Sequence, residues 1–208
     1  MLWEETDAGP SQVIKSISPS HISRVKYGRY DGGNEAAEAG NKYHKILSQK
    51  LKQGSMDGDL GLVRRLPHGR EIPVSGYLGS EYEVNARLDN VLASIGGEAD
   101  VVEGKSRGQW EDVDIATAAC TTFAIMRSGK FSSDVRFYYC YGYGFRLIRI
   151  NLGGMLYLEQ PMEVLAEATL ACLGYLPPGH KSRKKDELKG NFTFAFENFV
   201  RMAFPYFG

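Results

Sequence analysis

The alternation of apolar and polar residues along this chain predicts helices interleaved with strands. Residues 34–53 carry apolar side chains at helical spacing, and residues 111–127, 163–173 and 191–207 also favour helices. Residues 72–93 supply the first strands, with a strict period of two over 83–89, and residues 99–105 form another strand-like run. Aromatic residues on either side of a glycine-containing turn predict a hairpin over 134–151. We therefore expect one α/β domain over residues 1–208, with helices around a mixed central sheet.

The turn between two of these strands brings charged residues together. Residues 94–98 favour a glycine-containing hairpin turn, and Asp89 and Glu103 each lie seven positions from Gly96 at its centre. As cross-strand partners, their Cβ atoms would be roughly 4.5–5.5 Å apart. Lys105 shares the face of Glu103, because side chains two apart on a strand point to the same side. Two carboxylates and an ammonium on one face indicate a site for a divalent cation.

A simple salt bridge is the other explanation of the pair Glu103-x-Lys105. Charged residues are common enough that roughly one chance Glu-x-Lys is expected in a chain of this size. The second example, Glu187-x-Lys189, lies in a charged run without strand character, and we set it aside as a site. Two adjacent valines before the first pair predict a strand inside the sheet, where charges must be paired or liganded. A salt bridge and a bound cation both meet that requirement.

An aspartate followed by Glu-x-Lys on the next strand resembles the PD-(D/E)XK nuclease superfamily. Two N-terminal motifs are similar to its RecB-like branch, which includes the exonuclease associated with CRISPR adaptation. Ser18-Pro19-Ser20 opens a short predicted helix, and Gly40 precedes His44 by four positions. The resemblance spans roughly residues 18–150, and small nucleases of archaeal rod-shaped viruses look similar in size and layout. It implies a restriction-endonuclease-like core.

The resemblance implies roles for five positions. Asp89, Glu103 and Lys105 would be catalytic, and Asp89, Glu103, His44 and the Gly104 carbonyl would hold one Mn²⁺ or Mg²⁺ ion. Such an ion polarises the scissile phosphate and lowers the pKa of a bound water. The lysine would orient that water or stabilise charge on the phosphate oxygens. Without the resemblance, a lone histidine on the apolar face of a helix is more often a core residue.

Other residues are weaker candidates for contacts with nucleic acid. Arg87 lies two positions before the aspartate, so it can hold a phosphate or form a surface ion pair. The family's Gln-x-x-x-Tyr motif, on the helix after the lysine, is missing here, and Gln109, Asp114 or Thr117 are candidates to replace it. Tyr143 lies at the tip of the aromatic hairpin, where it can stack on a base. At least half of the hairpin's aromatic residues face the core instead.

The number and spacing of the cysteines bear on whether the protein holds an iron–sulfur cluster and on its cellular compartment. The CRISPR-associated relatives hold an iron–sulfur cluster through one cysteine after the first helix and three near the C-terminus. Here residues 27–30 contain no thiol, and Cys120, Cys140 and Cys172 lack cluster spacing. We expect no iron–sulfur cluster. Scattered free thiols favour a reducing interior, so we expect an intracellular protein of the cytoplasm, or of the host cell's cytoplasm if it is viral.

Net charge and hydropathy indicate which kinds of binding partner to expect. The 25 basic and 25 acidic residues give zero net charge, which argues against a general nucleic-acid coat protein but allows local basic patches. Candidate patches, each of which is more often a solvated face, are Arg64-Arg65, Arg127 with Lys130, and residues 181–185. No run approaches the roughly 18 apolar residues of a membrane span, and the acidic N-terminus is unlike a signal peptide. We expect no membrane partner.

These expectations converge on metal-dependent hydrolysis of DNA phosphodiester bonds, by endonuclease or exonuclease action, in replication, recombination or repair. Relatives of this branch often prefer single strands or free ends, so single-stranded DNA is the first expected substrate. Two alternatives stay open: a structure-specific nuclease for junctions or duplexes, and an inactive member of the fold that binds DNA. RNA as substrate and a homo-oligomeric assembly also stay open.

Overall fold

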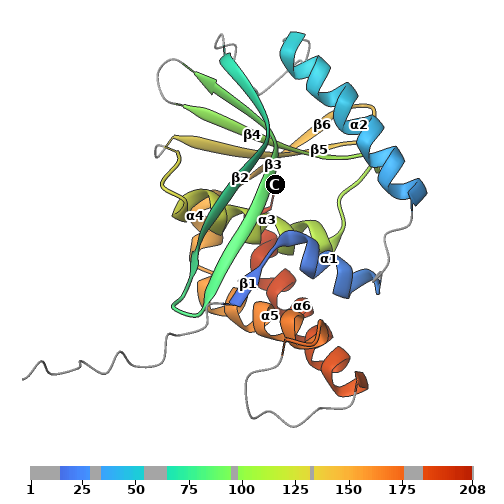
Figure 1. The fold of residues 1–208 in the computed structure, drawn as a ribbon, viewed down its shortest axis with the longest axis vertical. Coiled ribbons are helices and arrows are strands. Elements are labelled where there is room, and N and C mark those ends of the chain that lie inside the picture. Colours follow the sequence, from blue (N-terminus) through green and yellow to red (C-terminus); the bar gives the residue numbers. More distant parts are fainter. Residues whose placement is uncertain are drawn as a thin grey trace, which may run out of the picture.

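The computed structural model describes residues 15–28, 34–53, 65–94, 98–131, 134–175 and 185–207. These residues form six strands and six α-helices (Figure 1). The strands are β1 (Lys15–Ile17), β2 (Arg65–Leu78), β3 (Tyr82–Ser94), β4 (Ala99–Lys105), β5 (Val135–Tyr141) and β6 (Arg146–Ile150). The helices are α1 (Pro19–Tyr27), α2 (Asn34–Gln53), α3 (Asp112–Arg127), α4 (Leu152–Leu156), α5 (Glu159–Cys172) and α6 (Lys185–Ala203), followed by a 3₁₀ turn over Phe204–Tyr206. The predicted α/β fold, a mixed sheet flanked by helices, is confirmed.

The strands form one sheet in the order β1-β3-β4-β5-β6, and β2 pairs with β3 off this path. The β1–β3 and β4–β5 pairs are parallel, whereas the other pairs are antiparallel. Strand β4 therefore lies inside the sheet, as its two adjacent valines predicted. Val101 and Val102 are both fully buried.

These two valines also show how the helices are layered. Val101 belongs to a large apolar core that includes most of α3, while Val102 belongs to a smaller one with Tyr43 and Leu47 of α2. Because neighbouring residues of a strand point to opposite faces, α2 covers one face of the sheet and α3 the other. Helices α5 and α6 lie beyond α3 in Figure 1. The apolar residues of α3 are accordingly buried nearly all round.

Most predicted elements lie within a few residues of the observed ones, and the differences have local causes. Helix α5 begins at Glu159, four residues before the predicted start, and contains Pro161 in its first turn. Proline is tolerated there because that backbone N–H has no partner within the helix. Helix α6 begins at Lys185, six residues before the predicted start, and its first turns contain the Glu187-x-Lys189 pair that was set aside as a site. The predicted loop over 54–61 lies outside the described residues.

Candidate active site

The β3–β4 pairing has the register that the sequence predicted. Asn90 lies opposite Val102 and Leu92 opposite Asp100, which centres the hairpin on position 96, although Gly96 itself lies outside the described residues. The ladder ends at the Asn90–Val102 pair. The next step along both strands would pair Asp89 with Glu103.

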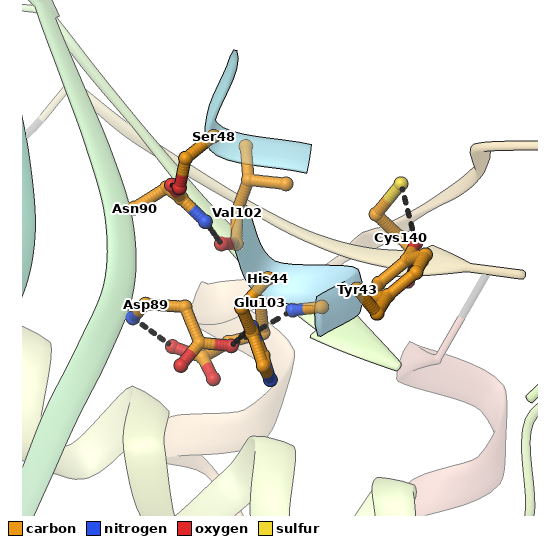
Figure 2. A network of polar contacts seen from close by, with 9 residues as sticks. Tyr43, His44, Ser48, Asp89, Asn90, Val102, Glu103 and Cys140 are labelled. Atoms are coloured by element: carbon orange, nitrogen blue, oxygen red, sulfur yellow. Dashed lines mark hydrogen bonds and ion pairs between the residues drawn. The ribbon is translucent and has the colours of Figure 1, made fainter. Parts of the chain in front are cut away.

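At that step, side chains replace the backbone ladder (Figure 2). The Asp89 N–H donates to Oε1 of Glu103 over 3.0 Å, and the Gly104 N–H donates to Oδ2 of Asp89 over 2.9 Å. Burial, followed by the negative charge of Asp89, raises the pKa of the Glu103 carboxyl well above its ordinary value, while Lys105 acts in the opposite direction. The site therefore holds two mutually repelling carboxylates in fixed positions.

Helix α2 brings His44 to these carboxylates by passing close over Gly104. A Cβ atom at position 104 would lie 2.9 Å from Leu47 Cδ2, 3.0 Å from Tyr43 Cε1 and 3.1 Å from His44 Nδ1. His44 Nδ1 lies 3.2 Å from Asp89 Oδ2 without hydrogen-bond geometry, and this buried nitrogen has no hydrogen-bond partner among the described residues. The glycine thus allows an imidazole nitrogen to reach the Asp89 carboxylate.

Two buried hydrogen bonds fix α2 in this position, as Figure 2 shows. The Tyr43 hydroxyl donates to the Cys140 carbonyl over 3.0 Å. The Ser48 hydroxyl donates to Oδ1 of Asn90 over 2.6 Å, and the Asn90 amide donates in turn to the backbone of β4. Both contacts lie within one or two turns of His44, so its ring is held by the packing of the whole helix.

Lys105 lies on the same face of β4 as Glu103, as predicted, and both residues line one cleft. Its ammonium lies 5.3 Å from the centroid of the Tyr139 ring. The Tyr139 hydroxyl shares a 3.1 Å hydrogen bond with Thr117, and burial raises its pKa, so it stays a neutral phenol. The sequence pattern did not predict this contact of Tyr139, because its position under Lys105 depends on the parallel pairing of β4 with β5.

The cleft beside these residues, which we call the basic cleft, has a volume of about 870 Å³ and is lined by α1, β2, β3, β4, α3 and β5, and by Lys130 after α3. Its described lining contains four basic residues and one acidic residue, Glu103, and it is rich in hydroxyl groups. The basic residues are Arg24, Arg87, Lys105 and Lys130, and the hydroxyls include Ser18, Ser20, Ser23, Thr117 and Thr121. The Ser18-Pro19-Ser20 motif therefore faces the same cleft as Glu103.

The remaining sequence candidates have different surroundings. Arg87 lines the basic cleft but is exposed and forms an ion pair with Glu71 at 3.3 Å. Gln109 is exposed in the bend that follows β4. Tyr143 is 56% exposed, and its ring packs edge-on against Tyr43 with 5.5 Å between centroids.

The three candidates to replace the missing Gln-x-x-x-Tyr motif differ in their position relative to the basic cleft. Thr117 lines the basic cleft, whereas Gln109 is not among its lining residues. Asp114 is buried and forms an ion pair with Arg107, which also pairs with Glu111. Because Asp114 also accepts a hydrogen bond from the Glu111 N–H at the start of α3, its carboxylate is already engaged within the protein.

The donor atoms suit a hard divalent cation in an open site. Among the described residues, no group of three or more His, Cys, Asp or Glu side chains lies close enough together to hold a metal ion. The 3.2 Å between His44 Nδ1 and Asp89 Oδ2 nevertheless matches neighbouring ligands of an octahedral ion, which at metal–ligand distances of roughly 2.1 Å lie about 3 Å apart. Carboxylate oxygens with one imidazole suit Mn²⁺ or Mg²⁺. The unsatisfied imidazole nitrogen and the paired carboxylates fit such an ion.

Comparison with known protein families finds no family model that matches the chain, and comparison with curated proteins finds no significant match. In the part of the chain that the structure describes, no helix combines the length and the apolar character needed to cross a membrane.

Proposed function

We propose that this protein is a metal-dependent deoxyribonuclease that hydrolyses phosphodiester bonds of single-stranded DNA, in the manner of PD-(D/E)XK nucleases. One observation carries the proposal. Asp89 and Glu103 are held side by side where β3 and β4 stop pairing, His44 lies next to Asp89, and Glu103 and Lys105 line the basic cleft.

Asp89, Glu103 and His44, with the Gly104 carbonyl, would hold one Mn²⁺ or Mg²⁺ ion. When bound, that ion polarises the scissile phosphate and supplies a water of lowered pKa as nucleophile. The protein fixes the two carboxylates through backbone N–H groups, so their positions do not depend on flexible loops. The hydrogen bonds from α2 orient the imidazole towards the same point.

Lys105 would stabilise the negative charge that develops on the phosphate oxygens. Its ammonium is held over the Tyr139 ring, which restricts it to the side of the strand that carries Glu103. A single preorganised donor of this kind contributes about 10²–10³-fold to the rate. The Lys105 side chain is therefore expected to act mainly on turnover, and less on binding.

The shape and charge of the basic cleft favour a single strand as substrate. Its volume of about 870 Å³ lies within the range of small-ligand pockets, roughly 300–1,000 Å³, which suits a few nucleotides better than a duplex. Basic side chains and hydroxyl groups are the usual partners of phosphate oxygens. The lining combines both, since Arg24 and Lys130 line the cleft together with Ser18 and Ser20.

The test is cleavage of oligonucleotides labelled at the 5′ or 3′ end, single- or double-stranded, with Mn²⁺, Mg²⁺ or EDTA. We expect metal-dependent cutting of single strands that is lost in Glu103→Gln and in Lys105→Ala. Glu187→Gln is the matched control, because it changes the chain's other Glu-x-Lys pair on α6. Cutting that survives in both site variants would contradict the proposal. A folded wild-type protein that binds DNA but never cuts it would support the inactive member of the fold.

A further inference from the structure

We infer that the surface that binds the DNA strand continues beyond the basic cleft, across Tyr27, into a second hollow lined by three lysines. This second hollow, which we call the lysine hollow, has a volume of about 320 Å³ and lies between the end of α1, the end of α5 and the start of α6. Its described lining is Val25, Lys26, Tyr27, Gly28, Cys172, Lys185, Leu188 and Lys189. The inference rests on the proposed function and extends its binding site.

The two hollows are joined at one residue of α1. Tyr27 lines both of them, while Ser20, Ser23 and Arg24, on earlier turns of the helix, line the basic cleft. Tyr27 is 40% exposed, and its hydroxyl donates to Glu111, which anchors the ring at the boundary. A partly exposed, anchored aromatic ring between two basic hollows is a suitable support for a nucleobase.

The distribution of charge supports a polyanionic ligand. The chain has equal numbers of basic and acidic residues, yet the described lining of the lysine hollow has three lysines and no acidic residue. Asp186 and Glu187 belong to the same turn of α6 as Lys185 but are not among the lining residues. Charges of one sign are thus gathered on the side of α6 that faces α1. Lining of one sign raises the local concentration of an oppositely charged ligand.

Lys26 is the most fixed of the three cations. Its ammonium lies 4.3 Å from the centroid of the Phe196 ring, and Phe196 is buried in the core beneath it. This cation–π contact holds the charge at the floor of the hollow. A cation positioned before the ligand arrives loses less side-chain entropy on binding.

The dimensions set the length of strand that reaches both hollows. The nine residues of α1 span about 13 Å at about 1.5 Å per residue. At roughly 3.4 Å per nucleotide, a strand covers this distance in about four nucleotides. A strand of about two nucleotides, roughly 7 Å long, is therefore too short to reach both hollows, whereas one of about twelve can occupy both.

The experiment measures binding of labelled single strands of about two and about twelve nucleotides to the Glu103→Gln variant, with Mn²⁺ and with EDTA. Charge reversal by Lys185→Glu with Lys189→Glu should weaken binding of the longer strand at least tenfold and leave the shorter strand unchanged. The dependence of log K on log salt should become shallower by about 1.4, since each lost phosphate contact of a single strand contributes about 0.7. Lys185→Gln with Lys189→Gln should give a smaller loss in the same direction.

Two controls separate the possible failures. Arg146→Glu with Arg149→Glu reverses two exposed charges on β6 that line neither hollow, and Arg24→Glu changes the basic cleft. If Arg24→Glu weakens binding but the folded lysine variants bind both strands normally, the extended site is wrong and the proposed function stands. If the β6 control loses as much affinity as the lysine variants, binding reflects overall charge and the inference is also wrong. If the Glu103→Gln parent binds neither strand, the proposed function fails first.

Discussion

Asp89 and Glu103 occupy the first step beyond the β3–β4 ladder, where the Asp89 N–H donates to the Glu103 carboxylate over 3.0 Å. The Asp89 carboxylate accepts a similar bond from the N–H of Gly104. The two strands are thus joined by acidic side chains at the point where a regular sheet would use its backbone. Two like charges this close destabilise the folded protein in the absence of a cation.

Glu103→Gln should therefore raise stability while it removes activity. Glutamine keeps a carbonyl oxygen that can accept from the Asp89 N–H, but it removes the charge repulsion, so the free energy of unfolding in EDTA should rise by about 1 kcal/mol. Because the folded-state pKa of Glu103 is raised, the wild type loses stability as pH rises above the ordinary glutamate value of 4.5. The gain from the substitution should be smallest below that pH and grow above it.

Urea unfolding of both proteins across this pH range, in EDTA, measures the effect, with Glu187→Gln as the control that should change neither quantity. A loss of stability at neutral pH in Glu103→Gln would mean that the charge itself holds the strands together. Restoration of wild-type stability by Mn²⁺, with little effect on the variant, is the expected companion result.

Gly104→Ala should disturb both the fold and the metal site. The added methyl group would lie within 2.9–3.1 Å of Leu47, Tyr43 and His44, and α2 cannot move away freely because Tyr43 is bonded to β5. We expect a loss of about 1–3 kcal/mol in the free energy of unfolding. Mn²⁺ affinity, measured by calorimetry, should fall as well, because His44 is displaced from Asp89.

Gly108→Ala is the matched control for this substitution. It lies in the bend after β4, where an added Cβ has open space within 4 Å. Its stability and Mn²⁺ affinity should stay close to the wild type. Equal losses in both variants would show that the close approach of α2 to β4 is not the cause.

The sequence predicted those parts of the site that depend on local geometry. The alternation over 83–89 and the turn at 94–98 were enough to place Asp89 beside Glu103, because strand period and hairpin register are short-range properties. The position of Lys105 on the same strand face as Glu103 followed from the same two-residue period. The long helix that carries His44 was also predicted, since its periodicity is local, and the short helix after Ser18 was expected from the family resemblance.

Other parts depend on packing between distant segments and were beyond sequence reasoning. Residues alone favoured a core role for His44, and only the close passage of α2 over Gly104 brings it to the carboxylates. Tyr139 supports Lys105 through a parallel strand contributed after α3. The basic cleft gathers side chains from six elements that are far apart in the sequence, so its charge pattern is not visible in any short segment of the chain.

Arg107→Ala should be strongly destabilising although Arg107 lies near the surface. Its guanidinium pairs with Asp114, which is only 1% exposed. Removal of the cation leaves the buried Asp114 carboxylate without its charged partner, although the carboxylate still accepts the capping hydrogen bond from the Glu111 N–H. Breaking such a pair costs about 3 kcal/mol. Arg87→Ala is the control, because its pair with Glu71 is exposed on both sides and should be worth less than about 1 kcal/mol. Thermal unfolding compares the two, and similar losses would contradict this account.

Tyr143→Ala should weaken binding of single strands without loss of fold. Tyr143 is 56% exposed, and its ring is supported edge-on by Tyr43, the residue that also contacts Gly104 beside the carboxylates. An exposed aromatic ring next to a phosphodiester site can stack on the neighbouring base, a contact worth about 1–3 kcal/mol. Measured on the Glu103→Gln background, affinity should fall by about tenfold and recover in Tyr143→Trp. Tyr157→Ala, which removes an 86% exposed ring between α4 and α5, should leave affinity unchanged, so an equal loss there would rule out stacking at Tyr143 as the cause.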